Sequence, residues 1–465
     1  MMSQTRIADK RIVIVGAGPT GLGTAHRFIE CGIRNFVVLE RQPHPGGLAS
    51  SFVDEEGFTW DVGGHVQFSH YQYFDDLMER LLPDDWLWHE RESWIWMQNT
   101  FIPYPFQNNI RHLPPDVMRE CLTGLIRTAR QRNAEPANFG EWIRCNFGEG
   151  IARHFMLPYN FKVWAYPPEE MDFQWVGERV AQVDLERIVF NVLDGRDDIS
   201  WGPNNRFRFP RRGGTGEIWR RLAASIPGGH IRYNTGVEYL DSTHKRLRLN
   251  DGRTEPYDIL ISTMPLDILV RNSDLNEYRS WVDLLRYSTV HVIGIGLKGE
   301  PSPSLRPKCW VYFPEATSPF YRATVFSNYS PHNVPNVSSH WSLMVEVAES
   351  PCKPVERDRL IDEVISALLE NRLVDSRSHI VSLWKYSAGH GYPTPYRRRD
   401  DVINSVLPAL ESGDIYSRGR FGAWKYEVSN QDHSLMQGVE LVDRLLGGVA
   451  EPTLWHPEVV NNVKR

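Results

Sequence analysis

The feature that most constrains the fold of this chain is the glycine-rich stretch GAGPTG, which begins at Gly16. An apolar run, Arg11–Val15, leads into the stretch, and a helical pattern, Thr20–Cys31, follows it. In such a strand–turn–helix the first glycine allows the tight turn, Gly18 lets the backbone approach a pyrophosphate, and Gly21 allows helix and strand to pack closely. The free N–H groups at the helix N-terminus attract the phosphates. The stretch therefore predicts a dinucleotide-binding site.

An acidic residue and two further glycine pairs distinguish between the dinucleotides. Glu40 ends a second apolar strand, 19 residues after the third glycine, where a carboxylate suits the hydroxyl pair of a ribose. The pairs Gly46-Gly47 and Gly63-Gly64 follow. A typical NAD dehydrogenase needs neither pair, whereas a long cofactor that lies extended through the domain needs several close backbone approaches. We therefore predict FAD rather than NAD.

The pattern of elements changes along the chain. A length of 465 residues suggests about three domain-sized units. Helix-rich sequence follows the N-terminal α/β pattern, and strands dominate from about residue 286 to 350. We predict an α/β fold with α+β insertions, built on a Rossmann-like FAD-binding domain. The predicted segments are 1–68, 205–270 and 415–465 for the FAD-binding domain, 69–204 for a helical domain, and 271–414 for a substrate domain with a mainly antiparallel β-sheet.

Composition and charge exclude several classes of protein. The net charge of −6 argues against a protein that binds nucleic acid or a membrane surface, since both need a basic face. No apolar run reaches the roughly 18 residues of a membrane span, and the N-terminus lacks the apolar core of a secretion signal. The five cysteines are scattered and form no CxxC pair. We therefore expect a reduced, cytoplasmic protein without structural disulfides, and we predict no metal site because no metal-ligand spacing stands out.

Clusters of aromatic, amide and arginine side chains recur through the rest of the chain. Ile102–Asn109 reads IPYPFQNN, Pro158–Trp164 reads PYNFKVW, and Phe320–Tyr329 reads FYRATVFSNY. Flat rings and amides suit a nucleobase and a sugar. Arginines suit a diphosphate, because the guanidinium donates two parallel hydrogen bonds. Any one of these side chains is more often a core aromatic or a surface arginine, but together they indicate a nucleotide-sugar site that faces the flavin.

These stretches resemble those of a known enzyme family over nearly the full length of the chain. GAGPTGLG, PGGLAS, PYPFQNNI, PYNFKVWA, RFPRRGGTG and RGRFGAWKYEVSNQDHS are similar in kind and order to the eukaryotic-type UDP-galactopyranose mutases. The resemblance implies a non-redox use of FAD, in which the reduced flavin attacks the anomeric carbon through N5 and expels UDP. The sugar ring then recloses on a different hydroxyl and recaptures UDP, so that pyranose and furanose forms interconvert. NAD(P)H is the reductant that the resemblance implies.

The resemblance also implies roles for individual residues. Arg179 and Arg322 are expected to clamp the diphosphate. Gly64 and His65 are expected on the loop beside the reactive edge of the flavin, and these four residues form the expected catalytic group. The expected substrate contacts are Phe68, Tyr104, Phe106, Gln107, Asn160, Trp164, Asn204, Tyr312, Tyr329, Tyr392, Arg420 and Tyr426. The expected FAD contacts are Gly16, Gly18, Gly21, Glu40, Arg41, Gly47, Leu48, Gly64, Val237, Asn430, Gln431 and Ser434.

Two positions depart from the family pattern. Ser429 stands where the family has glycine, beside the expected FAD contacts, and Gln67 stands beside Phe68 where an apolar residue is expected. Gln67 leaves open a GDP-linked or other nucleotide sugar as the substrate, with UDP-galactose as the leading prediction.

A flavin oxidoreductase of the amine-oxidase type is an alternative of another class, although an amine needs no arginine clamp. A nucleotide-sugar-binding module that has lost FAD or its chemistry is a third alternative, and a homo-oligomer is compatible with the resemblance.

Overall fold

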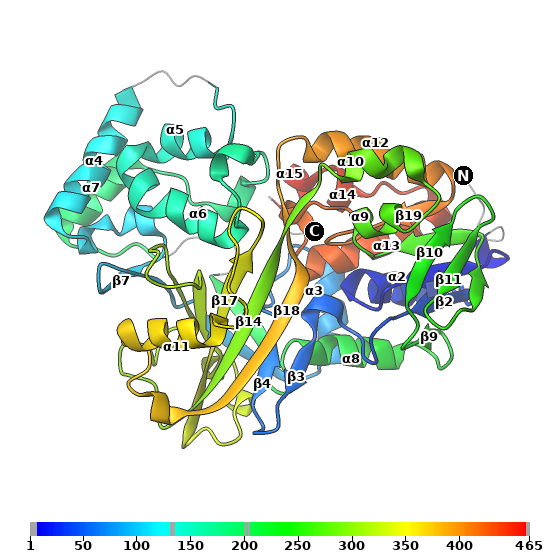
Figure 1. Cartoon of the computed structure of the whole chain (residues 1–465), viewed down its shortest axis with the longest axis horizontal. Helices are drawn as coiled ribbons and strands as arrows, with labels where there is room; N and C mark the ends of the chain where they lie inside the picture. The colour runs from blue at the N-terminus through cyan, green and yellow to red at the C-terminus, as the bar shows by residue number, and fades with distance from the viewer. Residues whose placement is uncertain (1–6, 131–134, 200–201, 203–204, 462–465) are drawn as a thin grey trace.

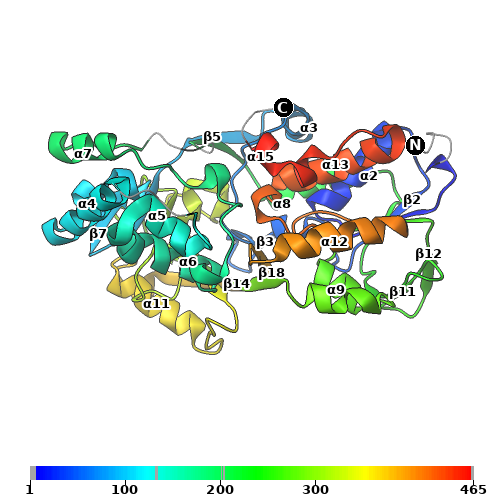
Figure 2. The same ribbon diagram turned by 90° about the horizontal axis from the view of Figure 1, so that it is seen from above.

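The computed structural model describes residues 7–130, 135–199, 202 and 205–461 of the chain. A unit of sheet and helices that carries the glycine loop lies at one end of the molecule, and a helical unit and a second sheet lie at the other (Figure 1, Figure 2). Two long strands, β14 (Arg286–Lys298) and β18 (Ile380–Thr394), run between the two ends. None of the described helices combines the length and the apolar character needed to cross a membrane.

A five-stranded parallel sheet carries the glycine loop. Its order is β19-β13-β1-β2-β9, and every neighbouring pair is parallel. Strands β1, β2 and β13 read IVIV, FVVL and ILIS and are buried at every residue, because helices cover both faces of the sheet. The strands are β1 (Ile12–Val15), β2 (Phe36–Leu39), β9 (Ile231–Arg232), β13 (Ile259–Ser262) and β19 (Ile415–Ser417).

Alternate residues of β1 face two different hydrophobic cores, as the period of a strand requires. Its two isoleucines belong to the core formed with α2 (Pro19–Glu30), α8 (Gly216–Ser225) and α13 (Gln431–Gly447). Its two valines belong to the core formed with α9 (Leu266–Arg271) and α12 (Arg399–Ser412). The sheet is therefore a central layer between two layers of helices.

A seven-stranded sheet of order β18-β14-β17-β16-β15-β6-β7 forms the second large layer. Its pairs are antiparallel except for the parallel pair of β15 and β6. Helix α11 (Leu360–Glu370) packs on this sheet. In the register of β16 and β17, Arg322 lies directly opposite Glu346. The remaining strands are β6 (Ser93–Met97), β7 (Thr100–Pro103), β15 (Trp310–Tyr312), β16 (Arg322–Val325) and β17 (His340–Glu349).

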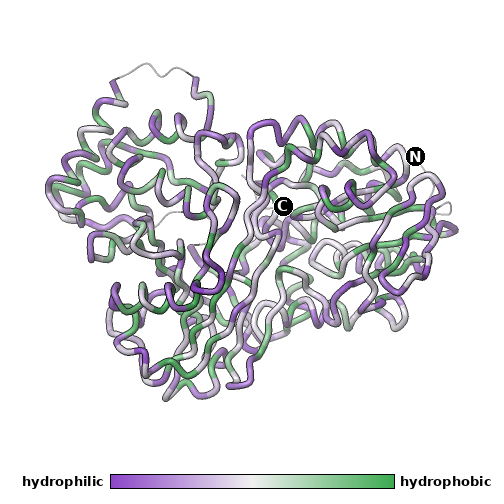
Figure 3. Tube along the Cα trace, in the orientation of Figure 1, coloured by the Kyte–Doolittle hydropathy of each residue, from purple (hydrophilic) through white to green (hydrophobic). Residues whose placement is uncertain are grey.

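Helices α4 to α7 form the helical unit around a core of their own. Helices α4 and α5 approach closely at glycines: Gly148 has a φ of +70°, and a Cβ there would lie 2.4 Å from the carbonyl carbon of Gly124. Hydrophobic and hydrophilic stretches alternate along these outer helices (Figure 3), as helices with one buried face require. The helices are α4 (Pro115–Arg130), α5 (Phe139–Ile151), α6 (Leu157–Trp164) and α7 (Leu185–Asp194).

Shorter elements connect these layers. Strands β3 and β4 form a hairpin before the Gly63-Gly64 pair, β5 pairs with β8, and β10, β11 and β12 form a small antiparallel sheet. Their bounds are β3 (Ser51–Val53), β4 (Thr59–Asp61), β5 (Trp86–Glu90), β8 (Arg206–Pro210), β10 (Val237–Asp241), β11 (Arg246–Leu249) and β12 (Thr254–Pro256). The short helices are α3 (Gln72–Leu81), α10 (Arg279–Val282), α14 (Pro452–Trp455) and α15 (Pro457–Val460).

The predicted fold class is confirmed: a Rossmann-like parallel sheet is combined with a helical unit and a mainly antiparallel sheet. The domain boundaries stay predictions, and two packing relationships cross them. Strands β6 and β7 come from 69–204 but complete the seven-stranded sheet, and α12 comes from 271–414 but packs on the five-stranded sheet. Both relationships join segments far apart in sequence, which local periodicity does not specify.

Candidate active site

The glycine loop joins β1 to α2 and leaves one of its faces open. A Cβ at Gly16 would lie 2.2 Å from Thr263 Oγ1, and a Cβ at Gly21 would lie 1.9 Å from the oxygen of Gly16, so packing within the chain requires both glycines. At Gly18 the nearest atom to a Cβ would be the Gly46 oxygen, 3.9 Å away. Helix α2 begins at Pro19 without a side-chain cap. The open face at Gly18 and the uncapped helix end fit a pyrophosphate.

The other predicted FAD residues of the N-terminal segment gather around this loop. The Glu40 carboxylate accepts hydrogen bonds from the backbone N–H groups of Ala17 (2.7 Å) and Gln42 (2.8 Å), one at each oxygen. Each oxygen has a second lone pair, so the carboxylate can still accept from ribose hydroxyls. A Cβ at Gly47 would lie 3.5 Å from the Cα of Gly18, which places the second glycine pair against the loop.

The predicted FAD residues beyond the loop divide into two groups. Arg41 lies beside β10, since a Cβ at Gly236, next to Val237, would lie 3.2 Å from the Arg41 Cγ. Leu48 and Val237 are both partly buried against the second core of the parallel sheet. The remaining residues lie at the start of α13: Asn430 is its N-cap, Gln431 accepts a hydrogen bond from Trp219 Nε1 (2.7 Å), and Ser434 follows one turn later.

The loop after β4 meets the seven-stranded sheet at Glu346. The backbone N–H of Gly64 donates to Glu346 Oε1 (3.0 Å), and Nε and Nη2 of Arg322 donate to the same oxygen at 2.9 and 2.6 Å. Nη2 also donates to Oε2 (2.9 Å), where the hydroxyl of Tyr321 donates as well (2.6 Å). Glu346 is 2% exposed. The carboxylate therefore holds the predicted diphosphate arginine and the predicted flavin-side loop together.

His65 is neutral at neutral pH. Burial lowers the pKa of its ring to about 4; Arg322 and Arg420 lower it further, and Glu346 opposes them. Its Nδ1 is buried and makes no hydrogen bond within the described part of the chain. A neutral imidazole can accept or donate a hydrogen bond, so His65 suits polar contact with a bound group.

Two arginines and three aromatic rings form the second part of the site. The guanidinium of Arg179 lies over the ring of Tyr426 (4.8 Å), and that of Arg420 lies over the ring of Tyr392 (4.8 Å). The rings of Tyr392 and Tyr426 are 5.8 Å apart, and both contact the ring of Trp164 edge-on, at 5.9 and 4.6 Å. The structure thus brings together residues from α6, β18 and the segment before α13.

The charges of these arginines are unevenly balanced. Arg179 donates to the carbonyl oxygens of Tyr426 (3.4 Å) and Glu427 (2.7 Å), and its Nε is buried and unpartnered. Arg420 donates to the oxygen of Gly391 and to the oxygen and hydroxyl of Ser429. Over the described residues, Arg322 alone of the three pairs with a carboxylate. An anionic ligand is the partner that the other two lack.

The predicted base-binding residues form an aromatic layer beside this group. The rings of Tyr104 and Tyr312 are 5.5 Å apart, and Tyr312 also contacts Tyr159 (5.2 Å). Phe106 is fully buried and stacks on Phe155 (4.5 Å), which in turn stacks on Tyr159 (5.3 Å), so in this conformation Phe106 packs behind the layer rather than in it.

The amides among the predicted substrate contacts are already engaged. Gln107 donates to the oxygen of Ala181 (2.7 Å). Asn160 donates to the oxygen of Met156 (2.8 Å) and accepts from Trp164 (3.3 Å), so it also fixes the Trp164 ring.

Three predicted residues lie in other settings. Tyr329 is buried among Phe207, Phe209 and Phe326, with its hydroxyl unpartnered in the described structure. Phe68 contacts the ring of His70 edge-on (5.6 Å). Asn204 lies outside the described residues.

Sequence reasoning missed Glu346, and it placed Tyr321 in an aromatic cluster without giving it a role of its own. Glu346 stands in WSLMVEV, where a carboxylate interrupts an apolar strand that is buried on both faces. A charge at such a position is costly unless it is paired, and this was the available signal. Its partner could not be found in this way, because the pairing depends on the register of β16 and β17.

A histidine–aspartate cluster lies beside the FAD residues of α13. His70 Nδ1 lies 2.8 Å from Asp432 Oδ2, and the backbone N–H of His70 donates to the same oxygen (3.1 Å). His433 Nδ1 lies 3.2 Å from Asp432 Oδ1. The three side chains are close enough to share a cation, with ligand atoms within 4.8 Å of one another. The hydrogen bonds between His70 and Asp432 also hold α13 against the loop before α3, so the cluster has a structural role without any cation.

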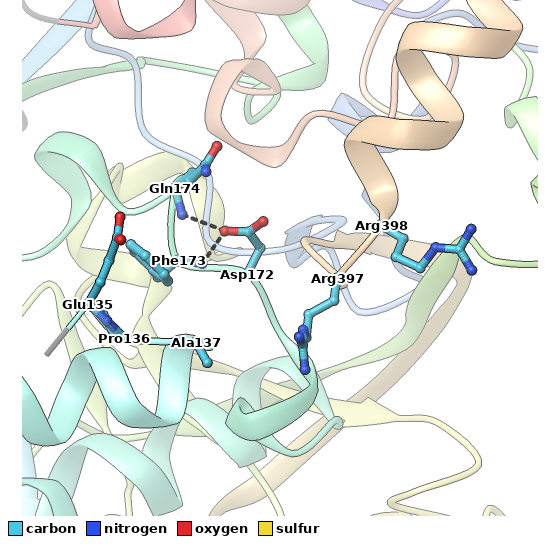
Figure 4. Close-up of a pocket in the computed structure, with 8 residues that line it drawn as sticks. All are labelled: Glu135, Pro136, Ala137, Asp172, Phe173, Gln174, Arg397 and Arg398. Carbon is cyan, nitrogen blue, oxygen red and sulfur yellow. Dashed lines mark hydrogen bonds between the residues drawn. The ribbon is translucent and has the colours of Figure 1, made fainter.

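A separate pocket opens between the helical unit and the start of α12. Figure 4 shows Asp172 bonded to the backbone N–H groups of Phe173 and Gln174, with Arg397 and Arg398 across the opening. The pocket encloses about 540 Å³ and is lined by none of the predicted site residues.

Comparison with known proteins supports a flavin site. The family profile described as flavin containing amine oxidoreductase matches residues 19–423. Among curated proteins, the chain is 28% identical over 280 residues to a 15-cis-phytoene desaturase of Glycine max and 26% identical over 291 residues to that of Arabidopsis thaliana. Each match covers 56% of this chain and 48% of the relative, so the match spans about half the length of these relatives.

Among solved structures, a reduced UDP-galactopyranose mutase superposes with a TM-score of 0.95 at 50% identity, over 98% of each chain. A putrescine oxidase bound to putrescine superposes with a TM-score of 0.64 at 12% identity, over 94% of this chain and 98% of that one. The second likeness concerns the fold alone. The likeness to the mutase extends to the sequence, since about half of the aligned residues are identical.

Proposed function

The chain belongs to the flavin-containing amine oxidoreductases and, among them, to the UDP-galactopyranose mutases, and on this premise we propose that it interconverts the pyranose and furanose forms of a nucleotide-diphosphate hexose. The observation that carries the proposal is the 50% identity to a mutase over 98% of the chain. The pair of half-buried arginines without carboxylate partners in the described structure, Arg179 and Arg420, supports it, because a diphosphate is the anion that such a site would take.

The residues of the parallel sheet fit FAD. The open face at Gly18, the uncapped start of α2 and the free lone pairs of Glu40 suit a pyrophosphate and a ribose, as argued above. Reduced FAD, when bound, supplies a nucleophilic nitrogen to the anomeric carbon, so the reaction needs no net transfer of electrons. NAD(P)H stays the proposed reductant.

The chain's own side chains bind and orient the substrate in this proposal. Arg179, Arg322 and Arg420 hold the diphosphate in place while its bond to the sugar is broken and remade, which keeps the leaving group within reach. The rings of Trp164, Tyr392 and Tyr426 exclude water from the sugar. Tyr104 and Tyr312 offer ring faces to the nucleobase.

UDP-galactose is the proposed substrate, and a GDP-linked or other nucleotide sugar stays the alternative. The alternative rests on Gln67. Its side-chain nitrogen is buried without a partner in the described structure, while its backbone pairs with Arg208.

An amine oxidase is disfavoured, since an amine would add a further cation beside three arginines. A cytoplasmic location is proposed from the five cysteines, none of which forms a disulfide, and a homo-oligomer stays a prediction.

The test is anaerobic incubation of the dithionite-reduced holoenzyme with UDP-, GDP- and dTDP-hexoses, followed by chromatography of the sugar nucleotides. Conversion of UDP-galactofuranose to UDP-galactopyranose is the expected result. Conversion of the GDP- or dTDP-sugar alone would retain the mutase reaction and change the substrate, and oxidation of an added amine without any ring conversion would contradict the proposal.

A further inference from the structure

Of the three arginines of the site, Arg322 alone has a carboxylate partner in the described structure. Glu346 bonds to Arg322 through Nε and Nη2, which leaves the two N–H groups of Nη1 without a hydrogen bond in the described structure. Arg179 and Arg420 donate to uncharged oxygens. Three guanidinium groups and one carboxylate therefore give this group a net charge of about +2 when all four are ionised.

Glu346 is ionised in the folded protein. Burial alone would raise the pKa of its carboxyl, but Arg322, the Tyr321 hydroxyl and the Gly64 N–H hold that pKa below its ordinary value. His65 does not change the balance, because its lowered pKa keeps the ring neutral. Glu427, the nearest acid in sequence to Tyr426, is fully engaged with Arg399 through two hydrogen bonds of 2.8 Å.

We propose that Glu346 sets the net charge of the arginine clamp, so that the clamp matches a bound nucleotide sugar and does not over-stabilise the released nucleoside diphosphate. The inference rests on the proposed mutase function. A nucleotide-diphosphate sugar carries a charge of about −2, and the free diphosphate about −3.

The matching matters when the anomeric C–O bond breaks. Both electrons of that bond stay on the diphosphate oxygen, and the same oxygen must later give an electron pair back to the anomeric carbon. A clamp with one more positive charge would bind the free diphosphate more tightly than the sugar ester, which lowers the energy of the separated state and slows the return. Glu346 is in this sense a positioning residue, since it acts through Arg322 and touches no substrate atom.

The test is the ratio of two affinities in the oxidised holoenzyme, that for UDP and that for UDP-galactopyranose, followed by tryptophan fluorescence. Glu346→Gln keeps the shape of the side chain and makes the net charge of the arginine clamp more positive by one unit. We expect this variant to bind UDP roughly tenfold more tightly relative to UDP-galactopyranose than the wild type does, with kcat reduced and KM not raised. Both ligands weakening by the same factor would overturn the proposal, because that result is expected of a purely structural glutamate.

Two further variants separate charge from geometry. The double variant Arg322→Met/Glu346→Gln removes one positive and one negative charge, so the affinity ratio should return to within about twofold of the wild-type value even though the absolute affinities fall. Tyr321→Phe removes a hydrogen bond to the same carboxylate at constant charge and should leave the ratio unchanged. A double variant whose ratio differs from the wild-type ratio by about tenfold would overturn the proposal. This comparison needs only the wild type and the double variant, so it stands even where Glu346→Gln fails to retain FAD.

The same data separate this inference from the function on which it rests. A wild-type protein that binds neither UDP nor UDP-galactopyranose would contradict both. A wild type that binds and converts UDP-galactopyranose, with an affinity ratio that does not respond to Glu346→Gln, would contradict the charge-matching role alone.

Discussion

Arg420 lies over the ring of Tyr392, with its guanidinium carbon 4.8 Å from the ring centre, and its N–H groups reach only uncharged oxygens in the described structure. Burial lowers the pKa of this guanidinium below its ordinary value. A buried cation without an anionic partner is costly unless a ligand supplies the charge. Arg179, which lies over Tyr426, likewise donates only to backbone oxygens in the described structure, so the two stacked pairs mark where a diphosphate would lie.

Replacing Arg420 tests this reading directly. Arg420→Ala should weaken binding of the nucleotide sugar by about 10- to 100-fold, or about 1.5–3 kcal/mol, because a charge-assisted contact to the diphosphate is lost. Isothermal titration calorimetry with UDP, which carries the same diphosphate, measures the loss of affinity. Arg377→Ala is the matched control, since Arg377 is an exposed arginine that pairs with Asp362. Equal changes in the two variants would contradict the assignment.

The hydroxyl of Ser429 should hold Arg420 in place. It accepts from Arg420 Nη1 (2.9 Å) and donates to the oxygen of Tyr426 (2.9 Å). The φ of Ser429 is −124°, so serine fits this position without strain. Ser429→Gly, which restores the family residue, should raise KM by about three- to tenfold through looser positioning of Arg420. An unchanged KM in steady-state assays would show that the backbone oxygens alone hold the arginine.

The open face of the glycine loop predicts a selective loss of FAD. In Gly18→Val the new Cβ would have the Gly46 oxygen as its nearest neighbour, 3.9 Å away, so the protein should fold. The added methyl groups should block the approach of the pyrophosphate, and the purified protein should be colourless. Flavin absorbance per protein and the unfolding temperature measure the two effects separately. Gly228→Ala is the control, since a Cβ there meets nothing within 4 Å. Full flavin occupancy in Gly18→Val would contradict the cofactor placement.

Arg322 should be needed both for the fold and for the reaction. Arg322→Ala leaves Glu346 buried and unpaired, which should cost about 3–5 kcal/mol of folding free energy. Arg322→Ala/Glu346→Gln should recover most of that stability without recovering turnover, because the diphosphate contact stays lost. Denaturant titration and mutase assays of the two variants measure this. Wild-type-like turnover in either variant would remove Arg322 from the mechanism.

The half-buried ring of His65 predicts a pH dependence of stability. Its folded-state pKa of about 4 lies below the ordinary value of 6.5, so the unfolded chain binds a proton that the folded protein does not. Stability should therefore be unaffected above about pH 6.5 and should fall as the pH drops toward 4, by up to about 3 kcal/mol from this group. Urea titrations of the wild type and His65→Asn across this range measure the difference. A parallel decline in both would assign the acid sensitivity to other groups.

The parts of the site that local sequence determines were predictable. The helix α2 (Pro19–Glu30) begins only one residue before its predicted start. The prediction was close because an apolar strand, a glycine turn and a helical pattern follow one another within about 20 residues of sequence. Gly16 and Gly21 are glycines for reasons of packing that any such loop shares.

The parts that depend on pairing between distant strands were not predictable. Glu346 meets Arg322 only because β16 and β17 pair in one register, and Gly64 joins them from another segment. A shift of one residue in either strand would turn its side chain to the opposite face of the sheet from the other. Asn160 is an example of the converse, since its predicted role at the nucleotide competes with hydrogen bonds inside α6 that only the structure shows.

The most direct measurement follows sugar conversion and flavin redox state together under anaerobic conditions. UDP-galactofuranose is added to a substoichiometric amount of dithionite-reduced holoenzyme, and flavin absorbance is recorded while the sugar nucleotides are separated by chromatography. We expect many turnovers to UDP-galactopyranose with the flavin still reduced at the end, and none with oxidised enzyme. Oxidation of the flavin in step with substrate consumption, or equal conversion by the oxidised enzyme, would contradict this expectation.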